Sequence, residues 1–98
     1  MDPSPRTRWQ VAASNRLLWA QWESDYSVFD GGTGDTHLLS ELPAEVLRQL
    51  SQGAMTEAAL TAKLARLCEV EETDDWMRKI AGLLAELADI ELIEPIGP

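Results

Sequence analysis

Cysteine and histidine, the side chains that most often bind zinc in proteins, are nearly absent from this sequence. The 98 residues include one of each, Cys68 and His37. A structural zinc site needs about four such ligands, so no metal centre of that type is expected. A single cysteine also excludes a disulfide within the chain and is typical of a reducing compartment.

Long apolar runs are also missing. No stretch approaches the ~20 consecutive apolar residues that a membrane-spanning helix needs, and residues 1–10 lack the apolar segment of a signal peptide. The hydrophobic share of 45% is nevertheless enough to fill one modest core. These features predict a soluble, cytoplasmic, single-domain protein with no membrane partner.

Basic residues are scarce: 8 Lys and Arg face 17 Asp and Glu, which gives a formal net charge of −9. Nucleic-acid affinity depends largely on lysine and arginine displacing counterions, so this charge argues against a nucleic-acid partner. It favours basic or neutral partners instead. The plainer alternative is that the acidic surface only keeps a small domain in solution.

The first half of the chain has the pattern of strands. Residues 1–8 contain two prolines and no periodic apolar pattern, and are expected to form a flexible arm. Short alternating or apolar runs at Trp9–Val11, Leu17–Trp22 and Tyr26–Asp30 predict a three-stranded antiparallel meander. Both faces of the second run are largely apolar, so we expect one face to be covered by helices and the other only partly shielded. The glycine-rich turn at Gly31–Gly34 then leads toward the first helix.

After this turn the apolar residues recur at helical spacing, and three helices are predicted. The first ends near Leu50 and has Pro43 in its first turn, the second is capped by Thr56, and the third runs from about Trp76 to Ala88 with Asp74 and Asp75 at its cap. An extended tail follows. The predicted class is α+β, a three-stranded antiparallel sheet followed by a three-helix bundle. The main apolar positions are Leu39, Leu42, Val46, Leu47 and Leu50 in the first helix, Leu60, Leu64, Leu67 and Cys68 in the second, and Trp76, Ile80, Leu83, Leu84 and Leu87 in the third.

No arrangement of residues typical of catalysis stands out. His37 falls at the predicted start of the first helix, where a structural role is expected, and Cys68 falls on an apolar helical stripe as a small core residue. The Gly31–Gly34 turn lacks the following lysine of a phosphate-binding loop. Acidic pairs such as Glu71–Glu72 lie in a linker and are read as solvated. We therefore predict that the protein is not an enzyme and carries no cofactor or metal.

Two stretches resemble the PqqD-like family. They are the phrase Gly34–Ser40, Gly-Asp-Thr-His-Leu-Leu-Ser, and the closing run Leu83–Glu94. The phrase is similar to the branch of this family named for HPr-rel-A systems. With the order of three strands and three helices, the resemblance covers residues 9–94. It implies a winged-helix-like domain that acts as a peptide chaperone, a recognition element for ribosomally made, modified peptides.

The resemblance also implies a partner and a site. The leader of a precursor peptide would add as a strand beside the third strand, pack on the third helix, and be presented to a modifying enzyme such as a radical SAM or kinase-related protein. Strand addition at an edge supplies main-chain hydrogen bonds, and side-chain pockets give selectivity. The implied peptide-binding residues are Tyr26, Ser27, Val28, Phe29 and Asp30 in the strand, and Met77, Ile80, Ala81 and Leu84 in the helix.

Two other functions remain open from the residues alone. A winged-helix DNA-binding regulator could use Lys63 and Arg66 of the second helix, although the net charge opposes it. A self-associating assembly protein could instead pair its own exposed strand edges into a homodimer. The four tryptophans, Trp9, Trp19, Trp22 and Trp76, are expected mainly in the core, with one of them able to anchor a peptide.

Overall fold

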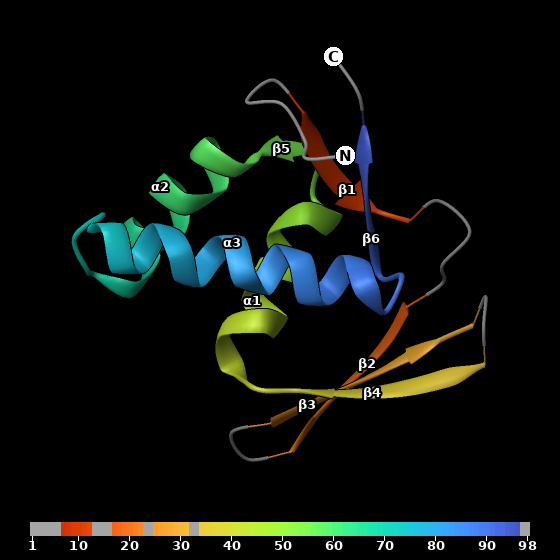
Figure 1. Cartoon of the computed structure of the whole chain (residues 1–98). Coiled ribbons are helices and arrows are strands. Elements are labelled where there is room, and N and C mark those ends of the chain that lie inside the picture. The colour runs from red at the N-terminus through yellow and green to blue at the C-terminus, as the bar shows by residue number, and fades with distance from the viewer. Residues whose placement is uncertain (1–6, 13–16, 23–24, 32–33, 97–98) are drawn as a thin grey trace.

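The chain has an α+β fold, as predicted, with three helices and two small antiparallel sheets of three strands (Figure 1). The computed structural model describes residues 7–12, 17–22, 25–31 and 34–96. The elements in chain order are β1 (Arg8–Val11), β2 (Leu17–Trp22), β3 (Asp25–Asp30), β4 (Asp35–Leu39), α1 (Glu41–Ser51), β5 (Met55–Thr56), α2 (Glu57–Cys68), α3 (Asp74–Asp89) and β6 (Ile93–Ile96).

One sheet joins the two ends of the chain. β1 is its central strand, with β5 on one side and β6 on the other, and Arg8 pairs with both Thr56 and Ile96. The Gln10 amide donates a 2.8 Å hydrogen bond to Glu94 across this pairing. The prediction that the first strand belongs to the meander is therefore wrong, because its partners β5 and β6 come from the middle and the far end of the sequence. The predicted arm is also too long, since Thr7 is buried and Arg8 lies in β1; residues 1–6 lie outside the described residues.

The second sheet has the order β2-β3-β4, so β3 is its central strand. The prediction that Tyr26–Asp30 lies at a sheet edge is wrong, because β3 pairs with β2 along one side and with β4 along the other. The cause is the glycine turn. Gly34 has a φ of 82° and its N–H donates a 2.7 Å hydrogen bond to the Asp30 carbonyl, which closes a hairpin instead of leading directly into a helix. The residues after it form β4.

The two faces of this sheet differ, as the sequence predicted. Cross-strand partners share a face, and the inner face places the fully buried Val28 and the buried Leu39 against α1. The outer face carries Leu18, Phe29 and Leu38, all of them exposed. One side of the sheet therefore belongs to the core and the other forms apolar surface.

The starts of α1 and α2 agree with the sequence prediction, and the cap of α3 differs from it. Pro43 lies in the first turn of α1, where its missing N–H costs no helical hydrogen bond. Thr56 caps α2 by accepting a 3.2 Å hydrogen bond from the Ala59 N–H. The cap of α3 is Thr73, which accepts a 3.1 Å hydrogen bond from the Trp76 N–H. The predicted caps, Asp74 and its neighbour, instead occupy the first turn, where their charge favours the helix dipole.

The core is built around α1, which contacts β1, β3, β4 and the other two helices. Trp9 is buried in it, and the Trp76 indole donates a 3.1 Å hydrogen bond to the Thr61 carbonyl, which ties α3 to α2. Two predicted core positions are wrong: Leu67 and Cys68 lie in the last turn of α2, where the apolar stripe reaches solvent. The buried apolar side chains are Trp9, Val28, Leu39, Ala44, Val46, Leu47, Leu50, Leu60, Leu64, Ala65, Ile80, Leu84, Leu87, Leu92 and Ile93.

Within the described residues, no helix has both the length and the apolar character needed to cross a membrane.

Two leucines of α2 test this assignment of the core. Leu64 is fully buried, whereas Leu67 is 54% exposed. Leu64→Ala should lower the free energy of unfolding by about 2–5 kcal/mol, because it leaves a cavity, while Leu67→Ala should change it by less than about 1 kcal/mol. Urea unfolding followed by circular dichroism measures both variants. Equal losses would show that α2 buries a different face.

Candidate functional site

The open backbone of the second sheet lies on β2 and β4. In the described residues each of these strands pairs only with β3, so the other side of each is an edge. Edge strands present a row of N–H and C=O groups to which another extended segment can pair. β4 is also the strand that leads directly into α1.

The five strand residues implied by the resemblance lie on both faces of the central strand β3. Val28 and Asp30 are fully buried, and Tyr26 is half-buried on the same inner face. Phe29 is exposed and Ser27 is half-buried on the outer face. Because both sides of β3 are already paired, these residues have no free backbone to offer an added strand. Only their outward side chains remain accessible.

The four helical residues implied by the resemblance lie along one face of α3, but they differ in exposure. Ile80 and Leu84 are core residues, so a partner cannot reach them in this conformation. Met77 is 46% exposed and Ala81 is half-buried. The predicted set therefore contains two accessible helical positions and two that support the fold.

The residues of β4 alternate between surface and core. Thr36 and Leu38 are exposed on the outer side, with Leu38 at 78% exposure, while Leu39 is buried and His37 is half-buried. His37 pairs with Val28 in the sheet, so its predicted place at the start of a helix is wrong. Its buried Nε2 atom has no hydrogen-bond partner in the part of the chain that the structure describes.

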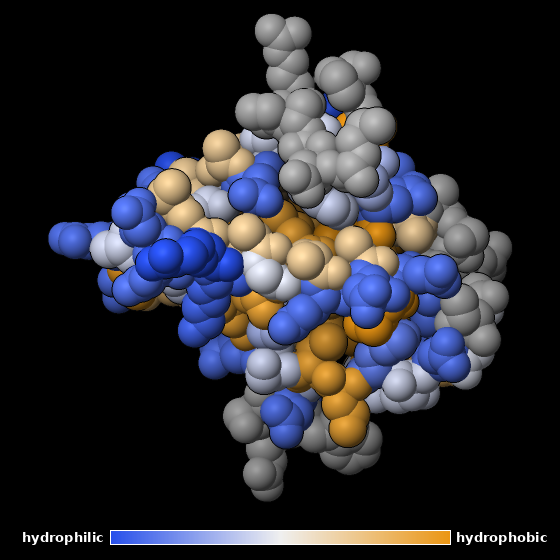
Figure 2. Space-filling model, viewed as in Figure 1, coloured by the Kyte–Doolittle hydropathy of each residue, from blue (hydrophilic) through white to orange (hydrophobic). Residues whose placement is uncertain are grey.

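Apolar surface connects this edge with the third helix. Figure 2 shows hydrophobic residues gathered below α3 and continuing across the sheet region occupied by β4, between more polar surroundings. Contiguous apolar surface of this kind often marks an interaction site. An open strand edge and an adjoining apolar surface together provide the two elements of a strand-addition site.

Sequence reasoning missed β4, although a signal was present. The signal is the four-residue link Gly31–Gly34, which follows an alternating run, because a short glycine-containing link of this length is typical of a hairpin loop. Leu38 and Leu39 do not show it by themselves, since they also match the start of the helical pattern that continues through Leu42.

The cysteine and histidine lie on different elements. Cys68 is exposed at the end of α2 and His37 lies in β4. Among the residues that the structure describes, no group of three or more histidine, cysteine, aspartate or glutamate side chains is arranged to hold a metal ion.

Comparison of the chain with family models, curated proteins and solved structures finds no match. The resemblance to PqqD-like proteins therefore depends on the two short phrases given above.

Hydrogen exchange can establish which strand is the edge. Every backbone amide at Ser27, Val28 and Phe29 should be protected, because β3 is paired on both sides. In β4, alternate amides should exchange much faster, because every second N–H of an edge strand points away from its partner. Amide exchange followed by NMR on dilute protein measures this pattern. Uniform protection along β4 would contradict the assignment and show that a further strand covers it.

Proposed function

We propose that this protein is a peptide chaperone without catalytic activity, which binds the leader of a ribosomally made precursor peptide as an added strand on β4. The bound peptide would then be presented to a modifying enzyme, such as a radical SAM or kinase-related protein. The observation that carries the proposal is the open edge of β4 beside the apolar surface that extends to α3.

The energetics of such a complex follow from the geometry. An added strand would form main-chain hydrogen bonds to β4, each contributing roughly 0.5–1.5 kcal/mol net. Alternate side chains of the peptide would face the apolar surface below α3, and the others would lie next to Leu38 on the outer side. Leu38 is the most exposed of the large hydrophobic residues identified in the structure, so covering it gives a substantial gain.

Charge sets the preferred kind of peptide. The net charge of −9 attracts a basic or neutral segment and repels a phosphate backbone. Arg66 is exposed and Lys63 is half-buried on α2, and two basic side chains do not outweigh this field. A peptide partner is therefore favoured over DNA.

The resemblance to PqqD-like proteins supports the same function with a corrected site. The resemblance implies that the leader adds beside the third strand, but β3 is paired on both sides, so we propose the neighbouring edge strand β4 instead. The proposed strand residues are therefore Thr36 and Leu38 of β4 instead of Tyr26–Asp30. On α3, Met77 and Ala81 remain accessible. We place this activity in the cytoplasm, on the reducing character that a single cysteine suggests.

A second candidate function is self-association, favoured by the exposed outer face of the sheet. Leu18, at 66% exposure, Phe29 and Leu38 lie on this face. A stable interface buries about 800 Å² on each partner, more than three side chains can supply, so a dimer would also need paired edges. Sedimentation at several concentrations distinguishes the two functions, because only self-association makes the average mass rise with protein concentration.

Two leucines test the peptide site. The probe is a synthetic peptide taken from the N-terminal part of any short reading frame found beside this gene, and binding is followed by tryptophan fluorescence. Leu38→Asp should weaken binding about tenfold or more, because it places a charge where an apolar contact is lost. Leu67→Asp, an exposed leucine of α2, should leave the affinity within about twofold. Equal weakening by both variants, or no binding by the unchanged protein, would contradict the proposal.

A further inference from the structure

Two aromatic rings and one arginine form a compact cluster between α1 and the inner face of the sheet, with Trp19 on β2, Tyr26 on β3 and Arg48 on α1. The guanidinium carbon of Arg48 lies 5.3 Å from the centre of the Tyr26 ring and 5.7 Å from that of Trp19. The two rings meet edge to face, with their centres 6.4 Å apart and their planes at 83°. Both distances from Arg48 are within the roughly 6 Å range of cation–π attraction, so the rings help to hold the cation in place.

A pocket of about 410 Å³ opens at this cluster, beside the edge strand β2. Its volume falls within the range of about 300–1,000 Å³ that is typical of small-ligand sites. Trp19, which is 37% exposed, supplies an aromatic wall. None of the lining residues is acidic, although the protein as a whole carries a charge of −9. The lining residues are Trp19, Ala20, Gln21, Tyr26, Arg48 and Ser51.

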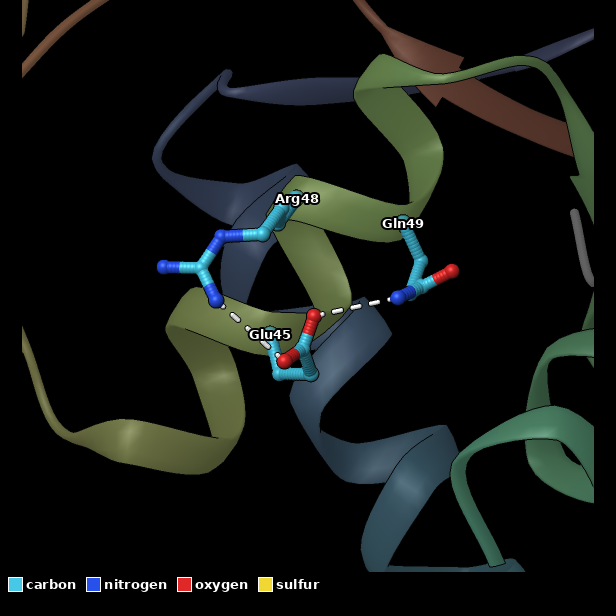
Figure 3. A network of polar contacts seen from close by, with 3 residues as sticks. All are labelled: Glu45, Arg48 and Gln49. Atoms are coloured by element: carbon cyan, nitrogen blue, oxygen red, sulfur yellow. Dashed lines mark hydrogen bonds and ion pairs between the residues drawn. The ribbon is translucent and has the colours of Figure 1, made fainter. Parts of the chain in front are cut away.

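Glu45 holds the arginine but leaves much of its binding capacity unused. The guanidinium donates one 3.2 Å hydrogen bond to Glu45, and Gln49 donates a 3.1 Å hydrogen bond to the other oxygen of the same carboxylate (Figure 3). A guanidinium has five N–H donors, and within the described chain Arg48 has no other hydrogen-bond acceptor. Its side chain is 43% exposed. The Arg48 guanidinium is therefore held in place by Glu45, partly open to solvent, and able to bind a second anion.

We propose that this pocket binds a carboxylate carried on a flat apolar group, such as a free aromatic acid or the C-terminal aromatic residue of a polypeptide. The carboxylate pairs with the unused donors of Arg48, and the apolar group lies against Trp19. Arginine suits this role because its planar donors match a carboxylate. A singly charged ligand fits better than a phosphate, because one arginine shared with Glu45 cannot balance two negative charges in an acidic protein. This site is separate from the proposed peptide edge and goes beyond that function.

The probe for this site is N-acetyl-L-phenylalanine, titrated into labelled protein while the Trp19 indole N–H is followed by NMR. The Trp19→Phe variant assigns that resonance. The acid should shift it in a saturable way, and N-acetyl-L-phenylalanine amide, which lacks the carboxylate, should not. A hexapeptide ending in phenylalanine with a free carboxylate distinguishes the two sources: tighter binding than the free acid indicates a polypeptide C-terminus, and equal binding indicates a small acid.

Matched arginine variants test the role of the cation. Arg48→Gln should weaken binding of the acid about tenfold or more, the usual size of a lost charged hydrogen bond. The affinity of Arg48→Lys should lie between those of the unchanged protein and Arg48→Gln. Arg78→Gln removes a similarly spaced ion pair, with Asp75 on α3, and should leave the affinity within about twofold. Circular dichroism checks that each variant is folded. The proposal is overturned if the amide binds as well as the acid, if Arg48→Gln binds normally, or if no shift of Trp19 occurs up to about 10 mM acid.

Discussion

The burial of α1 between the two sheets is the constraint on which the rest of the structure depends. Its inward side chains Ala44, Val46 and Leu47 are fully buried, and the helix contacts strands of both sheets as well as α2 and α3. Because α1 covers only the inner face of the β2-β3-β4 sheet, the outer face and both edges remain uncovered by it. The same contact that makes the core therefore leaves the surfaces on which the proposed functions rest.

The two edges of that sheet offer different chemistry. β4 adjoins apolar surface that reaches α3, which suits an extended peptide held by its backbone. β2 adjoins the cluster of Trp19, Tyr26 and Arg48, which suits a single carboxylate held by charge. A small domain can thus present one site that depends on strand pairing and another that depends on one fixed cation. The two proposed sites lie at opposite edges of one sheet.

Much of the fold could be predicted from the sequence, because local periodicity determines it. The α+β class, the three helices, the Thr56 cap and the difference between the two sheet faces all followed from patterns a few residues long. The pairing of β1 with β6 could not be predicted in this way. Gln10 and Glu94 are 84 positions apart, and no local pattern specifies which distant strand will be a partner.

The candidate site was harder to predict for a related reason. The strand between the glycine turn and α1 is five residues long and ends in two leucines that fit either a strand or a helix. When these residues are assigned to the helix, the last strand of the predicted sheet is Tyr26–Asp30, so the edge is expected on β3 instead of β4. The Arg48 cluster was missed because its members, Trp19, Tyr26 and Arg48, come from three elements and meet only when α1 packs on the sheet.

The most direct test of the central claim is a filtered NOE experiment on labelled protein bound to an unlabelled leader peptide. Strand addition on β4 predicts contacts between backbone protons of the peptide and those of residues 35–39, spaced at every second residue as in an antiparallel or parallel ladder. Contacts that fall on β2, or on side chains of the outer face without a ladder pattern, would contradict the account.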